Sequence, residues 1–318
     1  MKIPFFWCNM NNFGDALNPI IFKRLANIDI KIAPLDTAAI IGIGSLLDMC
    51  LMDSHDKGVI KKPIIVFSTG IGFEEGGFFH NPDILLPERL KRNVKVFAVR
   101  GQLTKIRIEK MVGHKIDAVV GDGGLLVHKL IDKTKITPKY DLGIVPHFAD
   151  KDNPVFKKIT QKIPNSVILD PMVDVDSFLR NLCECRAVIS TAMHPLIACD
   201  ALRIPNMWVR ISEKTTSRYK FHDYYSAFGL DKEPFDLLKN DFDSDTLVSV
   251  VKNYDVSDTV VAKVQNDLMH ALNQVKQEIK KIQAQIFFTQ LHNGFVRFLC
   301  LFVPVRKWRR KLRNHMMM

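Results

Sequence analysis

No stretch of this sequence reaches the roughly 20 consecutive apolar residues that a transmembrane helix needs. The longest candidate, 295–305, is interrupted by Arg297 and Pro304. The first twelve residues also lack the charged and apolar regions of an export signal. We therefore expect a cytoplasmic protein that does not cross a membrane.

Cysteine is scarce and scattered, with six residues in a chain of 318. Only Cys183 and Cys185 lie close together, and a single Cys-x-Cys pair is a poor zinc signature. No two His or Asp residues show ligand spacing on a shared element, so we expect no metal site and no bound cofactor. The cysteines are expected to be buried free thiols in a reducing compartment.

Acidic residues are absent from the last 22 positions of a chain whose net charge is +11. Seven basic residues stand there among apolar ones: Arg297, Arg306, Lys307, Arg309, Arg310, Lys311 and Arg313. An anionic membrane surface attracts such a segment, so we expect residues 295–313 to make peripheral contact with the inner face of the plasma membrane. A solvated tail that lies on the protein itself is the alternative. Nucleic-acid binding is not expected, because no nucleic-acid-binding motif accompanies the tail.

Short apolar runs, each closed by a glycine turn, recur through the first half of the chain. They cover residues 38–41, 63–67, 94–99 and 118–120. Runs without polar alternation are typical of buried parallel strands. A helix-like stretch at 102–111 follows the third run and gives the strand–helix alternation of a doubly wound sheet.

A second series of strands begins after the polar stretch 133–139, which we interpret as a linker. Its strands are expected at 142–145, 166–169, 187–189 and 206–209, with helices at 176–184 and 195–202. Further on, Leu268, Leu272, Val275, Ile279 and Ile282 recur at helical spacing, which predicts an amphipathic helix packed on a lobe. The predicted fold is α/β, with two Rossmann-like lobes facing across a cleft (GT-B-like), C-terminal helices and a basic tail. The expected domains are 1–138 on the acceptor side, 139–245 on the donor side, and a helical extension at 246–318.

Glycine-bearing loops are the first candidates for a site. Gly14 and Asp15 precede a helix-like stretch at 20–25. A Gly-Asp turn that opens a helix directs free backbone N–H groups at a ligand, and an Asp that only caps the helix fits equally well. Gly44 and Gly72 stand in Gly-x-Gly turns that do not complete a dinucleotide-binding G-x-G-x-x-G pattern. We expect them to allow close approach of the backbone to a ligand.

Arg100 and His194 each follow a buried strand, where open α/β sheets bind ligands. We expect Arg100 to point into the cleft and to grip a carboxylate or phosphate. A surface ion pair with Glu109 or Asp117 is the alternative. His194 precedes an apolar helix, a position that disfavours its cationic form and suits proton transfer, although a core or capping histidine fits too. His147, after the first strand of the second series, is a further candidate.

Six motifs stand in order along the chain: Asn12-x-Gly14-Asp15, Gly42-x-Gly44-Ser45, Gly70-x-Gly72, Val99-Arg100-Gly101, Gly121-Asp122 and Ala192-Met193-His194. Together they resemble the polysaccharide pyruvyl transferase family, and within it the bacterial exopolysaccharide members of the succinoglycan type. The likeness covers about residues 9–229. Many members carry an arginine two residues before the histidine, where this chain has Ala192. Anion binding would then fall to Lys220, Arg210 or Arg203.

The resemblance implies a GT-B-like enzyme that uses phosphoenolpyruvate as co-substrate and forms a pyruvate ketal on a sugar of a bacterial surface polysaccharide or exopolysaccharide. It implies that Arg100 holds the donor's carboxylate or phosphate, that His194 acts as acid or base, and that Lys220 adds charge for the phosphate. Asp15 would shape the cleft or touch the acceptor, a glycan or lipid-linked oligosaccharide. The other substrate-binding candidates are Gly14, Gly44, Gly72 and His147.

Two other functions fit part of the pattern. A glycosyltransferase of the same fold that uses a nucleotide sugar would need a ribose-binding carboxylate after a glycine-rich turn. Only Glu213 stands near that place, and no such turn precedes it. A non-catalytic, membrane-associated scaffold of envelope polysaccharide assembly would tolerate replacement of both Arg100 and His194.

Overall fold

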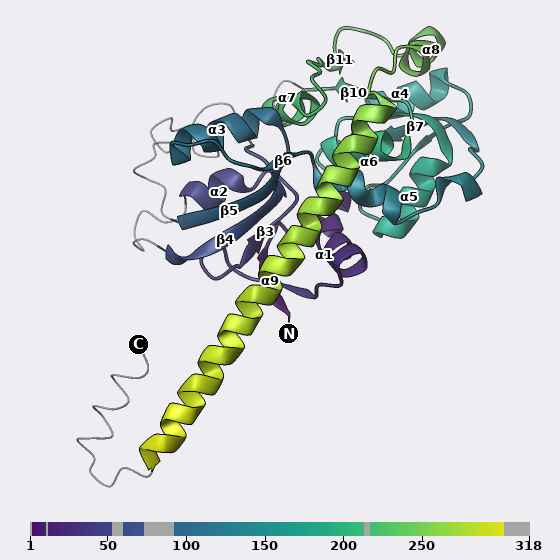
Figure 1. Cartoon of the computed structure of the whole chain (residues 1–318). Coiled ribbons are helices and arrows are strands. Elements are labelled where there is room, and N and C mark those ends of the chain that lie inside the picture. The colour runs from purple at the N-terminus through teal and green to yellow at the C-terminus, as the bar shows by residue number, and fades with distance from the viewer. Residues whose placement is uncertain (1, 11, 53–59, 73–91, 213–216, 302–318) are drawn as a thin grey trace. The chain divides into compact units, whose positions relative to one another are not determined.

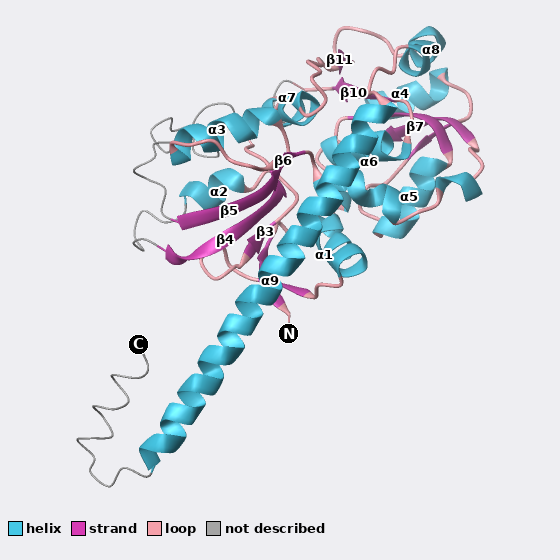
Figure 2. Cartoon of the chain, in the orientation of Figure 1, coloured by secondary structure: helices cyan, strands magenta, loops and turns pink. Residues whose placement is uncertain are grey.

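The computed structural model describes residues 2–10, 12–52, 60–72, 92–212 and 217–301 of the chain. It contains two parallel β-sheets with helices between the strands (Figures 1 and 2). The chain divides into two compact units, 1–272 and 273–318, and both sheets lie in the first. The predicted α/β class with two parallel sheets is therefore confirmed. The predicted domain boundaries after residues 138 and 245 remain predictions.

The first sheet has six parallel strands in the order β2-β1-β3-β4-β5-β6. Their bounds are β1 (Ile3–Phe6), β2 (Ile30–Ile32), β3 (Ile40–Ile41), β4 (Ile60–Thr69), β5 (Arg92–Val99) and β6 (Val119–Val120). The helices of this part are α1 (Phe13–Ala26), α2 (Leu47–Met52), α3 (Gln102–Val112) and the 3₁₀ helix η4 (Gly123–Lys129). The four apolar runs predicted as strands correspond to β3, β4, β5 and β6. β1 and β2 were not predicted.

The second sheet has five parallel strands in the order β11-β10-β9-β7-β8. Their bounds are β7 (Tyr140–Val145), β8 (Ser166–Ile168), β9 (Cys185–Ser190), β10 (Asn206–Arg210) and β11 (Phe235–Asp236). The helices are α4 (Pro154–Lys162), α5 (Val175–Cys183), α6 (Met193–Leu202), α7 (Tyr219–Ser226) and α8 (Ser244–Lys252). All four strands and both helices predicted here are present, with shifts of a few residues at their ends.

Strand order reverses once in each sheet, and at corresponding places. In the first sheet the chain runs outward in opposite directions from β1 and β3, and in the second from β7 and β9. A crevice forms at the carboxyl ends of the strands beside such a reversal, and open α/β sheets bind their ligands there. The topology therefore predicts ligand sites at the loops that follow β1, β3, β7 and β9.

Helices of the two sheets pack on one another. α1 contacts α5 and α6, η4 contacts α6, and α7 contacts α3. Each sheet has its own hydrophobic core, one around Ile41, Val66 and Val99 and the other around Ile144 and Ile189. The apolar runs of β3, β4, β7 and β9 are buried on both faces, as parallel strands covered by helices require, whereas those of β5, β6 and β8 are only partly buried.

Helix α1 begins seven residues before the predicted helix at 20–25. Pro19 lies inside α1. Proline has no N–H to donate to the carbonyl four residues earlier. Here the side chain of Asn18 donates to that carbonyl of Asp15 at 3.4 Å. The same side chain also accepts from the Ile43 N–H at 2.8 Å, which fixes the loop after β3 to α1.

The stretch predicted as a linker contains a short 3₁₀ helix, η5 (Lys133–Lys135). Lys133 Nζ donates to the carbonyls of Leu202 and Arg203 at the end of α6, at 2.9 and 2.8 Å. The connection between the sheets is therefore tied to the second sheet's largest apolar helix.

The predicted amphipathic helix is α9 (Asp258–Leu301). Within the first unit its buried apolar residues are Val261, Val264, Leu268, Ala271 and Leu272. The Gln265 side chain donates to the carbonyls of Leu125 in η4 and Ala201 in α6, at 3.0 and 3.2 Å. This part of α9 thus packs against both η4 and α6, which confirms the predicted packing here. No described helix has an apolar stretch long enough to cross a membrane.

Candidate active site

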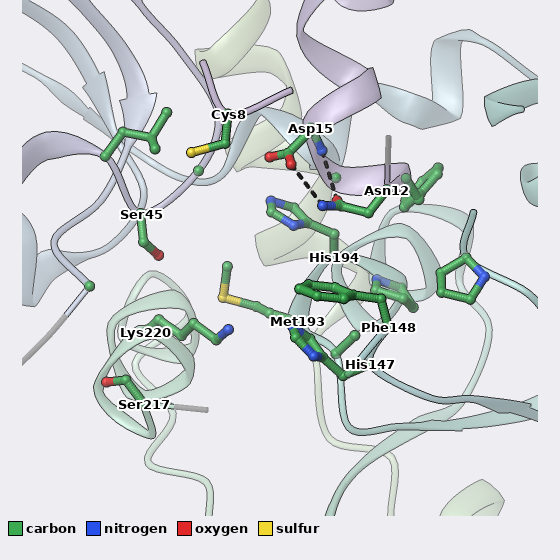
Figure 3. A pocket seen from close by; sticks show the side chains of 18 residues that line it. Cys8, Asn12, Asp15, Ser45, His147, Phe148, Met193, His194, Ser217 and Lys220 are labelled. Carbon is green, nitrogen blue, oxygen red and sulfur yellow. Dashed lines mark hydrogen bonds between the residues drawn. The ribbon is translucent and has the colours of Figure 1, made fainter. Parts of the chain in front are cut away.

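A cavity of about 420 Å³ lies where the loops after β1, β3, β7 and β9 meet (Figure 3). Its lining residues include Cys8, Asn12, Gly14, Asp15, Gly44, Ser45, Gly72, His147, Phe148, Met193, His194, Ser217 and Lys220. The volume falls in the roughly 300–1,000 Å³ range of small-molecule sites. Seven of the eight site residues expected from the sequence line this one cavity, and Arg100 does not.

Asp15 projects into the cavity from the first turn of α1 (Figure 3). The helix cap is Asn12, whose Oδ1 accepts from the Asp15 N–H at 3.1 Å. In return Asn12 Nδ2 donates to Asp15 Oδ2 at 2.7 Å. Burial raises the pKa of Asp15 to about 6, against the opposing hydrogen bonds from Met10 and Asn12. Asp15 is therefore not the capping residue, and its carboxylate is available to a ligand.

His194 is the second residue of α6, and its imidazole packs against Gly14 of α1. A Cβ at position 14 would lie 2.1 Å from His194 Nδ1, so only glycine admits the ring. His194 Nε2 is buried and has no hydrogen-bond partner among the described residues. Burial, with the nearby charges of Lys220 and Arg100, lowers the pKa of His194 to about 3. The imidazole is thus neutral near pH 7.

Lys220 reaches the cavity from α7. Burial lowers its pKa to about 8, helped by the charge of Arg100 and opposed by Asp150. The ammonium lies 5.4 Å from the centre of the Phe221 ring, a cation–π contact. Among the described residues no hydrogen bond or ion pair engages this Nζ, so its charge faces a cavity that can take an anion.

His147 follows β7, and hydrogen bonds to its backbone and to its ring fix its position. Its N–H donates to Thr191 Oγ1 at 2.7 Å. Its Nδ1 accepts from the Ala149 N–H at 3.3 Å, which assigns the proton of the neutral ring to Nε2. Burial and the charge of Lys220 lower the pKa of His147 to about 4. His147 therefore offers a neutral N–H donor, and no positive charge.

Arg100 differs from the expectation that it points into the cleft. Its side chain is 0% exposed and pairs with Asp223 of α7, with 2.9 Å between Nε and Oδ2. Nη1 donates to Ser45 Oγ at 2.6 Å and Nη2 to the Ile71 carbonyl. The alternative of a surface ion pair with Glu109 or Asp117 is also wrong, because the Arg100 side chain is buried and its partner is Asp223. Arg100 lies behind the cavity wall, where it donates to the cavity residue Ser45 and its charge acts on His194 and Lys220.

Several glycines of the motifs admit side chains of the protein itself. A Cβ at Gly70 would lie 2.3 Å from Cζ of Arg100, and one at Gly42 would lie 2.2 Å from Oδ1 of Asn18. Gly44 has a φ of +137° at the cavity wall, a conformation that favours glycine. The Gly72 N–H donates to both carboxylate oxygens of Asp48, each at 3.2 Å. Gly42 and Gly70 thus make room for side chains of the protein. Close approach of the backbone to a ligand stays a prediction for Gly44 and Gly72, which line the cavity.

Neither of the other arginines considered for anion binding lines the cavity. Arg210 pairs with Asp236, and Arg203 pairs with Asp258 at 3.1 Å. Of the candidates named after the Ala192 substitution, Lys220 is the one at the cavity. Glu213, the carboxylate considered for a nucleotide sugar, lies outside the described residues.

Sequence reasoning did not identify Ser45, Phe148, Ser217 and Asp223 as site residues. Asp223 does not line the cavity but pairs with Arg100, 123 residues earlier in the chain, so no local signal in the sequence could have found it. Cys8 lines the cavity and is half-buried, which differs from the expected buried thiols. Cys183, Cys185 and Cys199 are buried and free as predicted.

Comparison with known proteins adds a family to this geometry. The family model described as polysaccharide pyruvyl transferase matches residues 12–213, more than half of the chain. An uncharacterised protein, L143, of Acanthamoeba polyphaga mimivirus is 26% identical over 196 residues, 56% of this chain and 66% of the relative. The succinoglycan biosynthesis protein ExoV of Rhizobium meliloti (strain 1021) is 23% identical over 233 residues, 73% of this chain and 66% of the relative. The chain thus spans just under two thirds of the length of these curated relatives.

Proposed function

Because the chain belongs to the polysaccharide pyruvyl transferase family, we propose that it transfers the carbon skeleton of phosphoenolpyruvate to a sugar of a bacterial surface polysaccharide or exopolysaccharide. The acceptor is a glycan or lipid-linked oligosaccharide, and the product is a cyclic pyruvate ketal. One observation carries the proposal: a carboxylate, a neutral imidazole and an ammonium (Asp15, His194 and Lys220) line a single cavity of ligand size. We further propose that the two sheets form a GT-B-like pair around it.

The reaction balances with these groups. Two hydroxyl oxygens of one sugar form bonds to C2 of the donor, and the C2–O bond to phosphate breaks. One hydroxyl proton goes to the methylene carbon, which becomes the ketal methyl group, and the other leaves with phosphate. The enzyme must therefore remove protons from oxygen, deliver one to carbon and hold two anionic groups of the donor.

We assign the proton transfer to His194 and anion binding to Lys220. The imidazole is neutral near pH 7, because its pKa is about 3, and one ring nitrogen of a neutral imidazole has a lone pair that can accept a proton. His194 therefore first acts as a base towards an acceptor hydroxyl and then returns that proton to the methylene carbon. Lys220 and the Ser45 hydroxyl, which Arg100 polarises, bind the phosphate and carboxylate.

The test is to incubate the purified chain with phosphoenolpyruvate and a lipid-linked oligosaccharide and to follow phosphate release. We expect release that requires the glycan, and mass spectrometry of a glycan that has gained a carboxyethylidene group. Absence of release with every acceptor, together with turnover of a nucleotide sugar, would replace this proposal with a glycosyltransferase. Release that persists after replacement of Asp15, His194 and Lys220 would remove the site assignment.

The pKa values predict a bell-shaped pH dependence of kcat/KM. Asp15 loses its negative charge below about pH 6 and Lys220 its positive charge above about pH 8. His194 and His147 stay neutral across this range. Asp15→Asn is expected to abolish the acid limb, and Lys220→Arg to move the alkaline limb upward, because arginine stays protonated.

The substrate phosphate supplies the control for this profile, because its second pKa is also near 6. An acid limb caused by the substrate persists in Asp15→Asn at the same pH. That result would contradict the role of the Asp15 carboxylate.

We also propose that residues 295–313 hold the chain at an anionic membrane surface, which suits a lipid-linked acceptor. Residues 302–313 lie outside the described part of the chain. Deletion of residues 295–318 is expected to abolish co-sedimentation with phosphatidylglycerol vesicles at low salt, because seven basic residues are removed. Neutral phosphatidylcholine vesicles are the control. Undiminished co-sedimentation of the shortened chain with the anionic vesicles would contradict the proposal.

A further inference from the structure

Phe148 is an aromatic side chain exposed inside a cavity. Its exposed fraction is 38%, and it is the only aromatic among the large apolar side chains that are exposed in the described part of the chain. It also lines the cavity that holds Asp15 and His194 (Figure 3). An exposed aromatic surface in a recessed place indicates a ligand that covers it.

The ring of Phe148 is held in place by its neighbour. His147 and Phe148 have ring centres 4.3 Å apart at an interplanar angle of 36°. His147 is fixed in turn by its hydrogen bond to Thr191 and by the Asp150 N–H, which donates to its carbonyl at 2.7 Å. A preorganised ring loses little conformational freedom when a ligand covers it.

The chemistry of the ring separates the two substrates. The face of an aromatic ring carries partial negative charge, so it does not favour the phosphate or carboxylate of the donor. A pyranose presents a face of C–H groups with hydroxyls around its edge. Such a sugar ring can stack on Phe148 while its hydroxyls donate hydrogen bonds to the Asp15 carboxylate and to the imidazole of His194. Both of these side chains line the same cavity as Phe148.

We propose that Phe148, backed by His147, is the platform on which the pyranose ring of the acceptor stacks. The inference rests on the proposed function and deepens it, because it names the contact that recognises the acceptor. It also places a contact with the acceptor sugar in residues 139–245, which we expected from the sequence to lie on the donor side.

The kinetic test compares Phe148→Ala with Phe148→Tyr in the full chain. Phe148→Ala is expected to raise KM for the acceptor about tenfold, from the lost stacking and apolar contact, and to leave KM for phosphoenolpyruvate unchanged. Phe148→Tyr keeps the aromatic face and is expected to stay within about twofold of the native chain. Ile168→Ala is the matched control, because Ile168 is equally exposed at 38% and does not line the cavity.

A binding test without the donor separates this inference from the proposed function. Saturation-transfer NMR with methyl β-D-galactopyranoside and methyl β-D-glucopyranoside is expected to show transfer to the protons of one ring face, and its loss in Phe148→Ala. Such a result supports the platform even if the chain consumes no phosphoenolpyruvate. Three results would overturn it: a raised KM for phosphoenolpyruvate alone, an unchanged acceptor KM in Phe148→Ala, or no transfer to either glycoside in the native chain.

Discussion

His194→Ala is expected to lower kcat/KM for phosphoenolpyruvate by at least about a hundredfold, the usual contribution of a general acid–base. The side chain contributes the neutral imidazole at the cavity, and its Nε2 has no protein partner among the described residues to lose. The variant is therefore expected to stay folded, with an unchanged thermal transition. Phosphate release in the glycan-dependent assay measures the loss.

Two further variants make this prediction specific. Gly14→Ala places a Cβ 2.1 Å from His194 Nδ1 and is expected to reproduce much of the loss by displacing the ring. His128→Ala is the matched control, because burial lowers the pKa of His128 too, and His128 does not line the cavity. Equal activities of His194→Ala and His128→Ala would contradict the catalytic role.

Asp223→Ala is expected to destabilise the fold by about 3–5 kcal/mol, the usual cost of leaving one partner of a buried ion pair alone. Asp223 Oδ2 accepts from Arg100 Nε at 2.9 Å and from the Thr104 hydroxyl at 2.7 Å. Its Oδ1 accepts from the Thr104 N–H at 2.8 Å. Urea unfolding measures the change. Asp223→Asn is expected to destabilise the fold as well. Its NH₂ group, in the place of either carboxylate oxygen, would face a hydrogen-bond donor.

An exposed pair of the same chemistry provides the control. Arg24 and Asp176 form two hydrogen bonds of 2.6 Å between α1 and α5, with side chains that are 44% and 55% exposed. Asp176→Ala is expected to cost about 1 kcal/mol or less, because solvent screens exposed pairs. If the two alanine variants lose the same stability, Arg100 and Asp223 do not lock α7 to the first sheet.

The sequence predicted most strands because their apolar runs are unbroken and end at glycines. β1 escaped prediction for a physical reason. It is four residues long and includes Pro4, which lacks an N–H and is unusual in a strand between two neighbours. In this sheet the Pro4 carbonyl still accepts from the Ala39 N–H at 2.8 Å. The local sequence pattern therefore argues against a strand at Pro4, although the neighbouring strands accommodate this residue.

The site was predictable in part. Strand-end position and resemblance together pointed to Asp15, His194 and Lys220, and the structure brings all three to one cavity. Arg100 was misplaced because a strand-end arginine can project into a cleft or pass beneath it. Its partner Asp223 lies 123 residues away, and no local pattern encodes such a contact. Phe148 was missed because exposure, not residue type, distinguishes it.

The packing of His194 against Gly14 brings together cavity groups that neither sheet supplies alone. The imidazole comes from the second sheet, and the Asp15 carboxylate and the glycine seat come from the first. The distance between the imidazole and the carboxylate is therefore set by the packing of α1 against α6, a contact between helices of the two sheets.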